Sequence, residues 1–182
     1  MKNFILYSLI GLFLCTACKK EENNQKVDTT NSIQYDNKVR KIGYTKVTTL
    51  GRPDSTSSLY EFEILLADNR IKQLEEDSFA GIGDFVNLHL YASELNAPDI
   101  GVYKFDDPID SIHTFYAEYV VDYNVETDQS VSTLAFISGT MEIKSITENT
   151  FSIQIDGLLS NNKTLSLNYF GVYDENSDVV YW

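Results

Sequence analysis

Apolar and polar side chains alternate along most of this chain. A period of two places successive side chains on opposite faces of an extended strand, whereas a helix repeats its apolar positions every three or four residues. Aromatic and branched aliphatic residues, which strands favour, occupy many of these positions. The pattern therefore restricts the chain to an all-β fold. Three segments show it, with apolar positions at Tyr60, Phe62, Ile64 and Leu66, at Val86, Leu88, Leu90 and Ala92, and at Phe115, Ala117, Tyr119, Val121 and Tyr123.

The last third of the chain repeats the alternation and separates its strands by turn residues. Residues 140–146, 151–159 and 165–173 are predicted strands. The segments between them, 147–149 and 160–163, consist of polar residues that favour tight turns, so we expect two hairpins. The predicted inward positions are Phe151, Ile153, Ile155, Leu165, Leu167, Tyr169, Gly171 and Tyr173.

Shorter segments complete the predicted fold. Three of them are also predicted strands: residues 42–50, 101–105 and 179–182. Residues 69–80 instead predict a helical turn or an irregular loop anchored by Ile71 and Leu74. Many short strands without an internal repeat indicate a single antiparallel β-sandwich or barrel-like domain of about eight or nine strands. The pattern leaves sandwich and barrel open.

The first 17 residues follow the plan of a secretory signal. Lys2 supplies a basic start, residues 4–14 form an apolar run, and small residues precede Cys18. The run is shorter than the about 20 apolar residues that a transmembrane helix needs, and charged residues 19–22 follow it. We therefore expect residues 1–17 to be a cleaved signal peptide.

The segment Leu14-Cys15-Thr16-Ala17-Cys18 resembles the lipobox of bacterial lipoproteins, with Cys15 where leucine is usual. The resemblance implies that Cys18 is acylated and becomes the new N-terminus. Several acyl chains hold a protein stably on a membrane, because each buried methylene contributes about 0.8 kcal/mol. The implied partner is a membrane, reached through an N-terminal lipid anchor.

A polar, aperiodic segment follows the cysteine. We expect residues 18–35 to be a lipid-anchored flexible tether and residues 36–182 to form the β domain. Lys19-Lys20-Glu21-Glu22 resembles the export signal of Bacteroidetes surface lipoproteins. The resemblance implies a lipid-anchored outer-membrane protein exposed at the cell surface.

The β-rich region also resembles a group of uncharacterised Bacteroidetes outer-membrane and surface lipoproteins. The resemblance implies a β-rich domain on a lipid anchor and carries no activity. It rests on four short motifs in the same order, here Ile33-Gln34-Tyr35-Asp36-Asn37, Gly101-Val102-Tyr103-Lys104-Phe105, Gly139-Thr140-Met141-Glu142-Ile143 and Tyr169-Phe170-Gly171.

Cysteine content and charge exclude several kinds of site. Of the two cysteines, Cys15 leaves with the signal peptide and Cys18 carries the lipid. The mature domain then has no disulfide, no thiol nucleophile and no cysteine-ligated zinc. The net charge of −13 argues against a polyanionic partner, so we expect no nucleic-acid binding.

No arrangement of residues in the sequence predicts catalysis. A G-x-S-x-G nucleophile motif is absent, and the two histidines, His89 on a strand and His113 before one, are predicted surface residues. Glu61 and Glu63 share one strand face, which is common for solvated carboxylates. We therefore assign no catalytic residue.

Metal and cofactor motifs are incomplete. The acidic segments 106–110 and 174–178 lack the glycine and the closing glutamate of a calcium loop. Gly81-Ile82-Gly83 lacks the third glycine of a dinucleotide loop. We expect no metal and no cofactor.

Aromatic residues offer the remaining candidate site. Tyr91, Tyr116 and Phe170 occupy positions that the alternation places on outward faces. Outward aromatic rings on a β surface either stack against sugar rings or form a second layer of core. The leading hypothesis is a non-enzymatic surface module that binds a glycan or an envelope protein. The alternatives are a carboxylate-based hydrolase and a purely structural or inhibitor-like surface protein.

Overall fold

The computed structural model describes residues 30–54, 56–75, 78–107 and 111–176. Strands make up nearly all of its regular structure. They are β1 (Ser32–Tyr35), β2 (Lys38–Gly51), β3 (Tyr60–Asp68), β4 (Lys72–Glu75), β5 (Ser78–Ala80), β6 (Ile82–Ala92), β7 (Gly101–Phe105), β8 (Thr114–Asn124), β9 (Ser132–Ile146), β10 (Thr150–Leu159), β11 (Thr164–Val172) and β12 (Asp174–Asn176).

Nine of these strands close into a barrel, which confirms the all-β prediction. The hydrogen-bonded order runs β1-β11-β10-β9-β7-β8-β6-β3-β2, and β2 pairs with β1 to close the ring. Most pairs are antiparallel, but β7 runs parallel to β8 and β12 parallel to β2. The barrel is therefore mixed rather than purely antiparallel.

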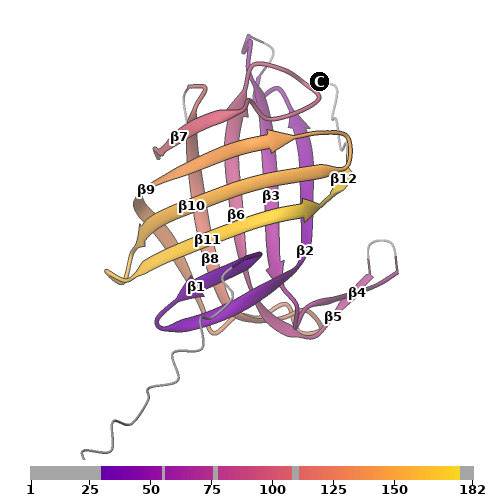
Figure 1. Cartoon of the computed structure of the whole chain (residues 1–182), viewed down its shortest axis with the longest axis vertical. Coiled ribbons are helices and arrows are strands. Elements are labelled where there is room, and N and C mark those ends of the chain that lie inside the picture. Colours follow the sequence, from indigo (N-terminus) through magenta and orange to yellow (C-terminus); the bar gives the residue numbers. More distant parts are fainter. Residues whose placement is uncertain (1–29, 55, 76–77, 108–110, 177–182) are drawn as a thin grey trace, which may run out of the picture.

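The barrel has two walls that cross steeply (Figure 1). Strands β9, β10, β11 and β1 form what we call the front wall, and β8, β6, β3 and β2 form the rear wall. Strand β1 lies at the lower end of the barrel in this view. The outer surfaces of the two walls thus point in opposite directions.

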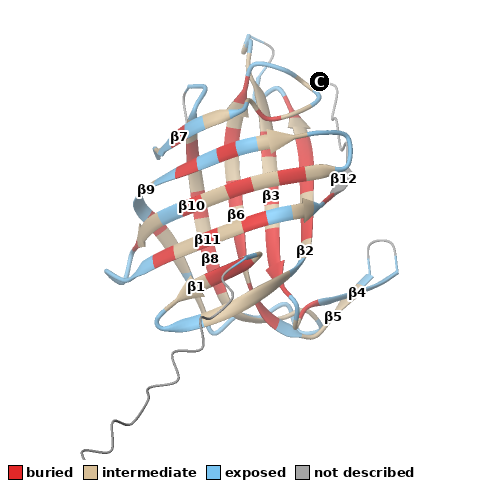
Figure 2. Ribbon diagram, viewed as in Figure 1, coloured by how far each residue is buried: buried red, intermediate tan, exposed pale blue. Residues whose placement is uncertain are grey.

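The core lies between the walls (Figure 2). Every second residue of β3, β6, β10 and β11 points inward, as the alternation predicts. Gly157 makes room there, because a Cβ at this position would lie 2.3 Å from the Phe136 ring. Each large apolar side chain that is fully buried contributes about 1.5–3 kcal/mol. The largest are Tyr103, Tyr119, Phe62, Phe115, Phe136 and Phe151.

The two hairpin predictions are confirmed, because β9–β10 turns at residues 147–149 and β10–β11 at 160–163. The prediction for residues 69–80 is wrong. They form the β4–β5 hairpin, which projects from the lower end of the barrel (Figure 1). Ile71 is buried as expected, but Leu74 is 64% exposed and anchors nothing.

The start of the fold also differs from the sequence prediction. Strand β1 begins at Ser32, and Ile33 is fully buried, so ordered structure starts before the predicted boundary between residues 35 and 36. The predicted closing strand at 179–182 and the predicted acylation site Cys18 lie outside the described residues.

Strand β8 follows the predicted alternation only as far as Tyr119. A register shift between Gly83 and Phe85 places one extra residue on β8, and Asp122 adopts a left-handed φ of 46°. At this bulge Val120 is buried, whereas Val121 and Tyr123 are only partly buried. Bulges redirect side chains in this way.

Candidate functional site

The structure divides the three candidate aromatic residues between the two walls. Tyr91 on β6 and Tyr116 on β8 lie on the outer surface of the rear wall, diagonally across from each other beside His89. Phe170 lies on β11, on the outer surface of the front wall. Tyr91 and Tyr116 therefore form one candidate surface, and Phe170 forms another.

The outer surface of the rear wall, here called the rear face, is a network of paired polar side chains. His89 Nδ1 lies 3.2 Å from Glu61 Oε1, and the Asn87 amide donates to Glu63 Oε1 over 2.9 Å. On the next strand the Tyr116 hydroxyl donates to Glu118 over 2.7 Å. Most of these polar side chains are therefore hydrogen-bonded to one another.

The protonation states of the rear face follow from these contacts. The hydrogen bond with Glu61, together with the charges of Glu63 and Glu118, raises the pKa of His89 above its usual range despite partial burial. Burial and the Glu118 hydrogen bond raise the pKa of Tyr116 to about 12. The neighbouring carboxylates thus favour the protonated imidazole over the neutral one.

A nucleophile is missing beside this histidine. Among the described residues, no serine or threonine hydroxyl lies within hydrogen-bond distance of His89. Glu61 and Glu63 do converge on His89, the second over 3.7 Å, but all three side chains are partly exposed. The group resembles a solvated ion network more than a general acid–base pair.

Phe170 has a different setting. Its side chain is 61% exposed, and its backbone is held by Asn31, whose amide nitrogen donates to the Phe170 carbonyl while its amide oxygen accepts from the Phe170 N–H. A pocket of about 260 Å³ lies beside the ring, lined also by Lys144, Ser152 and Asn168. The front wall therefore presents an exposed aromatic ring above a shallow polar pocket.

Two of the polar side chains that line this pocket are free of hydrogen bonds to other described residues. Within the described part of the chain, the side chains of Ser152 and Asn168 make no hydrogen bond. Lys144 donates to Gln154 over 2.8 Å and faces Glu142 at 3.8 Å. The hydroxyl and the amide remain available to a ligand.

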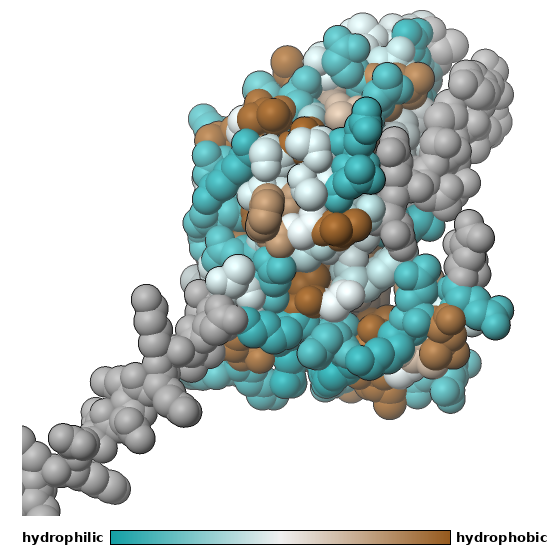
Figure 3. Space-filling view, turned by 45° about the vertical axis from the view of Figure 1, so that its right-hand side comes forward, coloured by the Kyte–Doolittle hydropathy of each residue, from teal (hydrophilic) through white to brown (hydrophobic). Residues whose placement is uncertain are grey.

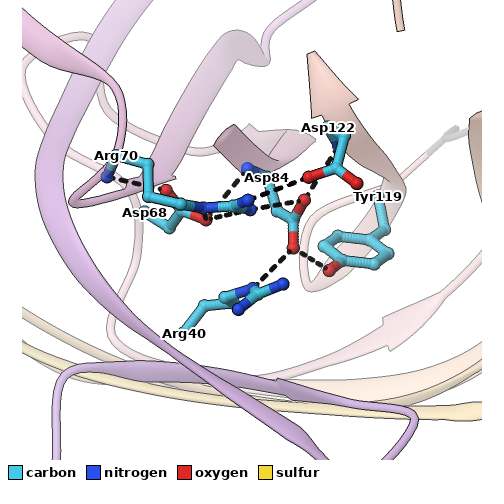
Figure 4. Close-up of polar contacts among 6 residues, drawn as sticks. All are labelled: Arg40, Asp68, Arg70, Asp84, Tyr119 and Asp122. Atoms are coloured by element: carbon cyan, nitrogen blue, oxygen red, sulfur yellow. Dashed lines mark hydrogen bonds and ion pairs between the residues drawn. The ribbon is translucent and has the colours of Figure 1, made fainter. Parts of the chain in front are cut away.

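A third polar region closes the lower end of the barrel (Figure 4). The Arg70 guanidinium donates to Asp68 over 2.7 Å and to Asp122 over 2.9 Å, and it forms an ion pair with Asp84 over 2.9 Å. Asp84 also accepts from the Tyr119 hydroxyl over 2.8 Å and from Arg40 over 3.3 Å. We call Arg40, Asp68, Arg70, Asp84, Tyr119 and Asp122 the Arg70 network.

Burial makes the Arg70 network a structural element. Asp68 and Asp84 are 0% and 3% exposed, and each also accepts a backbone N–H. Burial opposes ionisation of Asp84, but the hydrogen bonds from Asp122 and Tyr119 and the charges of Arg70 and Arg40 outweigh it and lower its pKa. The two buried carboxylates, Asp68 and Asp84, are thus paired inside the protein, whereas Asp122 and the two arginines are partly exposed.

Sequence reasoning missed the Arg70 network because its members come from separate strands and from the bulge on β8. One local signal was available: Asp84 interrupts an apolar run between Gly83 and Phe85. Gly83 is required beside it, since a Cβ there would lie 2.6 Å from Asp68 Oδ1.

The remaining sequence candidates are His113 and the two acidic segments. His113 packs its ring against buried Tyr103 at 5.1 Å between centroids. Among the described residues, no three His, Cys, Asp or Glu side chains are grouped to hold a metal ion. The same part of the chain contains no helix that is long and apolar enough to cross a bilayer. Portions of both acidic segments, 106–110 and 174–178, fall outside the described residues.

Comparisons with known proteins found no match: no family model, no curated protein and no solved structure resembles the chain closely enough to be identified with it.

Proposed function

We propose that this chain is a non-enzymatic binding module of the cell envelope, and that its ligand is a glycan that stacks on Phe170. The observation that carries the proposal is the exposed Phe170 ring above a pocket with a free hydroxyl and a free amide. A sugar ring has an apolar face and a rim of hydroxyl groups. An aromatic ring suits the face, and neutral hydrogen-bonding side chains suit the rim.

The shape of the pocket supports a polysaccharide rather than an enclosed small molecule. Its volume of about 260 Å³ is below the range of about 300–1,000 Å³ that buried ligands occupy. A shallow site covers one side of a ring and leaves the rest in solvent. Such a site suits a unit within a longer chain.

We further propose that acylation at Cys18 places the module at the outer membrane, facing outward. The lipobox resemblance and the polar segment at 19–31 support this address. Cys18→Ala is expected to release the protein from the membrane fraction, whereas Cys15→Ala is expected to leave it there. Continued lipid labelling of the Cys18 variant would contradict the assignment.

The binding proposal is tested by probing a glycan microarray with the full chain in detergent. Phe170→Ala is expected to weaken every signal at least about tenfold, because stacking and its buried area are lost. Tyr91→Ala is the matched control, since it removes an aromatic residue from the rear face. Binding that survives in Phe170→Ala and disappears in Tyr91→Ala would move the site to the rear face.

The alternative is a hydrolase that uses the rear-face carboxylates. The convergence of Glu61 and Glu63 on His89 is the observation in its favour. It predicts new reducing ends when the chain is incubated with the array glycans, and loss of that activity in Glu61→Gln. If the array shows neither binding nor cleavage, a structural or inhibitor-like surface role is left.

A further inference from the structure

The outward side chains of β11 connect two pockets. Thr164, Ser166, Asn168 and Phe170 alternate with the core residues of the strand and therefore share its outer face. Asn168 and Phe170 line the pocket described above. Thr164 and Ser166 line a second one, of about 300 Å³. We call these four outward residues the β11 track.

The second pocket lies where the β1–β2 hairpin meets the start of β11. Gln34 pairs with Ser166 across β1 and β11, and Lys38 and Val39 complete the wall. Strand rise is about 3.4 Å per residue, so the track from Phe170 to Thr164 is about 20 Å long. That length exceeds a single sugar ring and fits several in a row.

The polar groups along the track are unpaired. Within the described residues, the side chains of Gln34, Ser166 and Asn168 make no hydrogen bond, and Ser152 beside Phe170 makes none either. Hydroxyl and amide groups both donate and accept, which matches the hydroxyl rim of a sugar. The β11 track therefore offers a ligand repeated, chemically similar contacts.

Charge argues for a neutral ligand. The four track residues carry no ionisable side chain, although the protein as a whole has a net charge of −13. Two nearby cations are paired with carboxylates: Lys144 lies 3.8 Å from Glu142, and Lys163 lies 2.8 Å from Asp36. Lys38, which lines the second pocket, is the one lining cation without an ion pair among the described residues. A polyanionic chain would still be repelled by the net negative charge of the protein.

The surface around the track also argues against a protein partner. Large exposed apolar patches mark protein interfaces. On the face drawn in Figure 3, hydrophobic residues form separate spots among hydrophilic ones rather than one continuous patch. On β11 itself the exposed apolar residues are Phe170 and its outward neighbour Val172, 61% and 69% exposed, at one end of the polar line. An extended polar line with two apolar residues at one end suits a linear polymer better than a globular surface.

We propose that the β11 track binds a linear, uncharged oligosaccharide that spans both pockets, with one ring on Phe170 and the other end beside Gln34 and Ser166. The inference rests on the proposed glycan-binding function and adds the ligand's shape, charge and direction. Contacts made together along one ligand raise affinity far beyond that of a single unit.

The test is a length series measured by calorimetry with the full chain. The probes are glucose, N-acetylglucosamine and mannose oligomers from monosaccharide to hexasaccharide, and a galacturonate series as the charged comparison. For the sugar that binds, affinity is expected to rise about tenfold or more from the monosaccharide to the hexasaccharide and then to level off. The galacturonate oligomers are expected to bind more weakly than the neutral ones.

Two variants separate the ends of the track. The double variant Gln34→Ala and Ser166→Ala is expected to bind the hexasaccharide about fivefold or more weakly. Its affinity for the shortest oligomer that binds is expected to stay unchanged. Phe170→Ala is expected to weaken both. All these residues are outward, and thermal melting checks that each variant folds.

Three outcomes overturn the inference in different ways. Affinity that does not depend on length, or a Gln34 and Ser166 double variant that binds the hexasaccharide normally, refutes the track and leaves glycan binding at Phe170 intact. Preference for galacturonate refutes the neutral ligand. Failure of every oligomer to bind refutes the proposed function together with the track.

Discussion

The Arg70 network and the β11 track are both polar regions, but they use their hydrogen-bonding groups in opposite ways. In the Arg70 network, buried Asp68 and Asp84 are each bonded to a guanidinium and to backbone N–H groups. In the β11 track, the side chains of Ser166 and Asn168 bond to no other described residue. The groups of the Arg70 network find their hydrogen-bond partners inside the protein, whereas those of the β11 track can bond to a ligand.

This difference distinguishes polar regions that stabilise the fold from polar regions that can bind a ligand. A buried, fully paired network contributes to stability and costs several kcal/mol when it is broken. An exposed, unpaired set contributes little to folding and is free to bind. The rear face lies between them, because its carboxylates and His89 are exposed yet largely paired with one another.

The largest expected effect is on folding, from Arg70→Ala. The substitution leaves Asp68 and Asp84 buried without their cation, and we expect the free energy of unfolding to fall by about 3 kcal/mol. Arg52→Ala is the matched control, since Arg52 is exposed and, among the described residues, bonds only Tyr60. Its loss is expected to cost less than about 1 kcal/mol. Urea denaturation measures both. Equal losses would mean that the network does not hold the barrel end.

A smaller loss of stability is expected in acid. The pKa of Asp84 is lowered in the folded protein, so its ionised carboxylate stabilises the fold fully at pH values above its pKa in the unfolded chain, about 3.9. This stabilisation is lost as pH falls through the pKa of the folded protein. Urea denaturation between pH 7 and pH 3 measures this loss. In Asp84→Asn the free energy of unfolding is expected to fall less steeply at the acid end of this range. An unchanged pH profile in that variant would exclude Asp84 as its source.

Substitutions in the β11 track are expected to weaken binding and to leave the stability of the fold nearly unchanged. Asn168→Ala should leave the free energy of unfolding within about 0.5 kcal/mol of the parent, because the side chain has no partner to lose. Its affinity for the best hexasaccharide should fall by about 1 kcal/mol, or roughly fivefold. Calorimetry and thermal melting on the same preparation give both numbers. A stability loss as large as that of Arg70→Ala would erase the contrast between the two regions.

The smallest effect is expected on the rear face. Glu61→Gln removes the main cause of the raised pKa of His89, so that pKa should fall toward 6.5 in an NMR titration. The His89–Glu61 pair stabilises the fold fully below pH 6.5, and this stabilisation is lost as pH rises through the pKa of His89 in the folded protein. The free energy of unfolding is expected to change by less than about 1 kcal/mol. Oligosaccharide binding should not change. Loss of binding in this variant would assign the site to the rear face.

Much of the barrel was predictable because its core depends on a local pattern. Alternation alone placed Phe62, Leu88 and Ile155 inside, and polar turn segments placed the β9–β10 and β10–β11 hairpins. Where alternation fails, the cause is a local irregularity. The bulge opposite Asp84 shifted β8, and residues 69–80 formed a hairpin although their sequence lacks a strand period.

The candidate sites were less predictable, because outward position does not reveal pairing. The sequence placed Tyr91, Tyr116 and Phe170 on outward faces alike, yet strand order decides that Phe170 lies on the other wall. Arg70 lies only two residues from Asp68, but Asp84 and Asp122 come from β6 and β8, so the sequence does not show that these groups meet. Pairing between distant strands is a property of the closed ring, which a linear pattern does not contain.

The most direct test is NMR chemical-shift mapping of the isotopically labelled chain with the tightest-binding neutral hexasaccharide. The account predicts the largest amide shifts at Ser152, Ser166, Asn168 and Phe170, with smaller ones at Gln34. Shifts concentrated instead at Glu61, His89 and Tyr116 would place the ligand on the rear face and contradict the central claim that unpaired groups on the front wall form the binding surface.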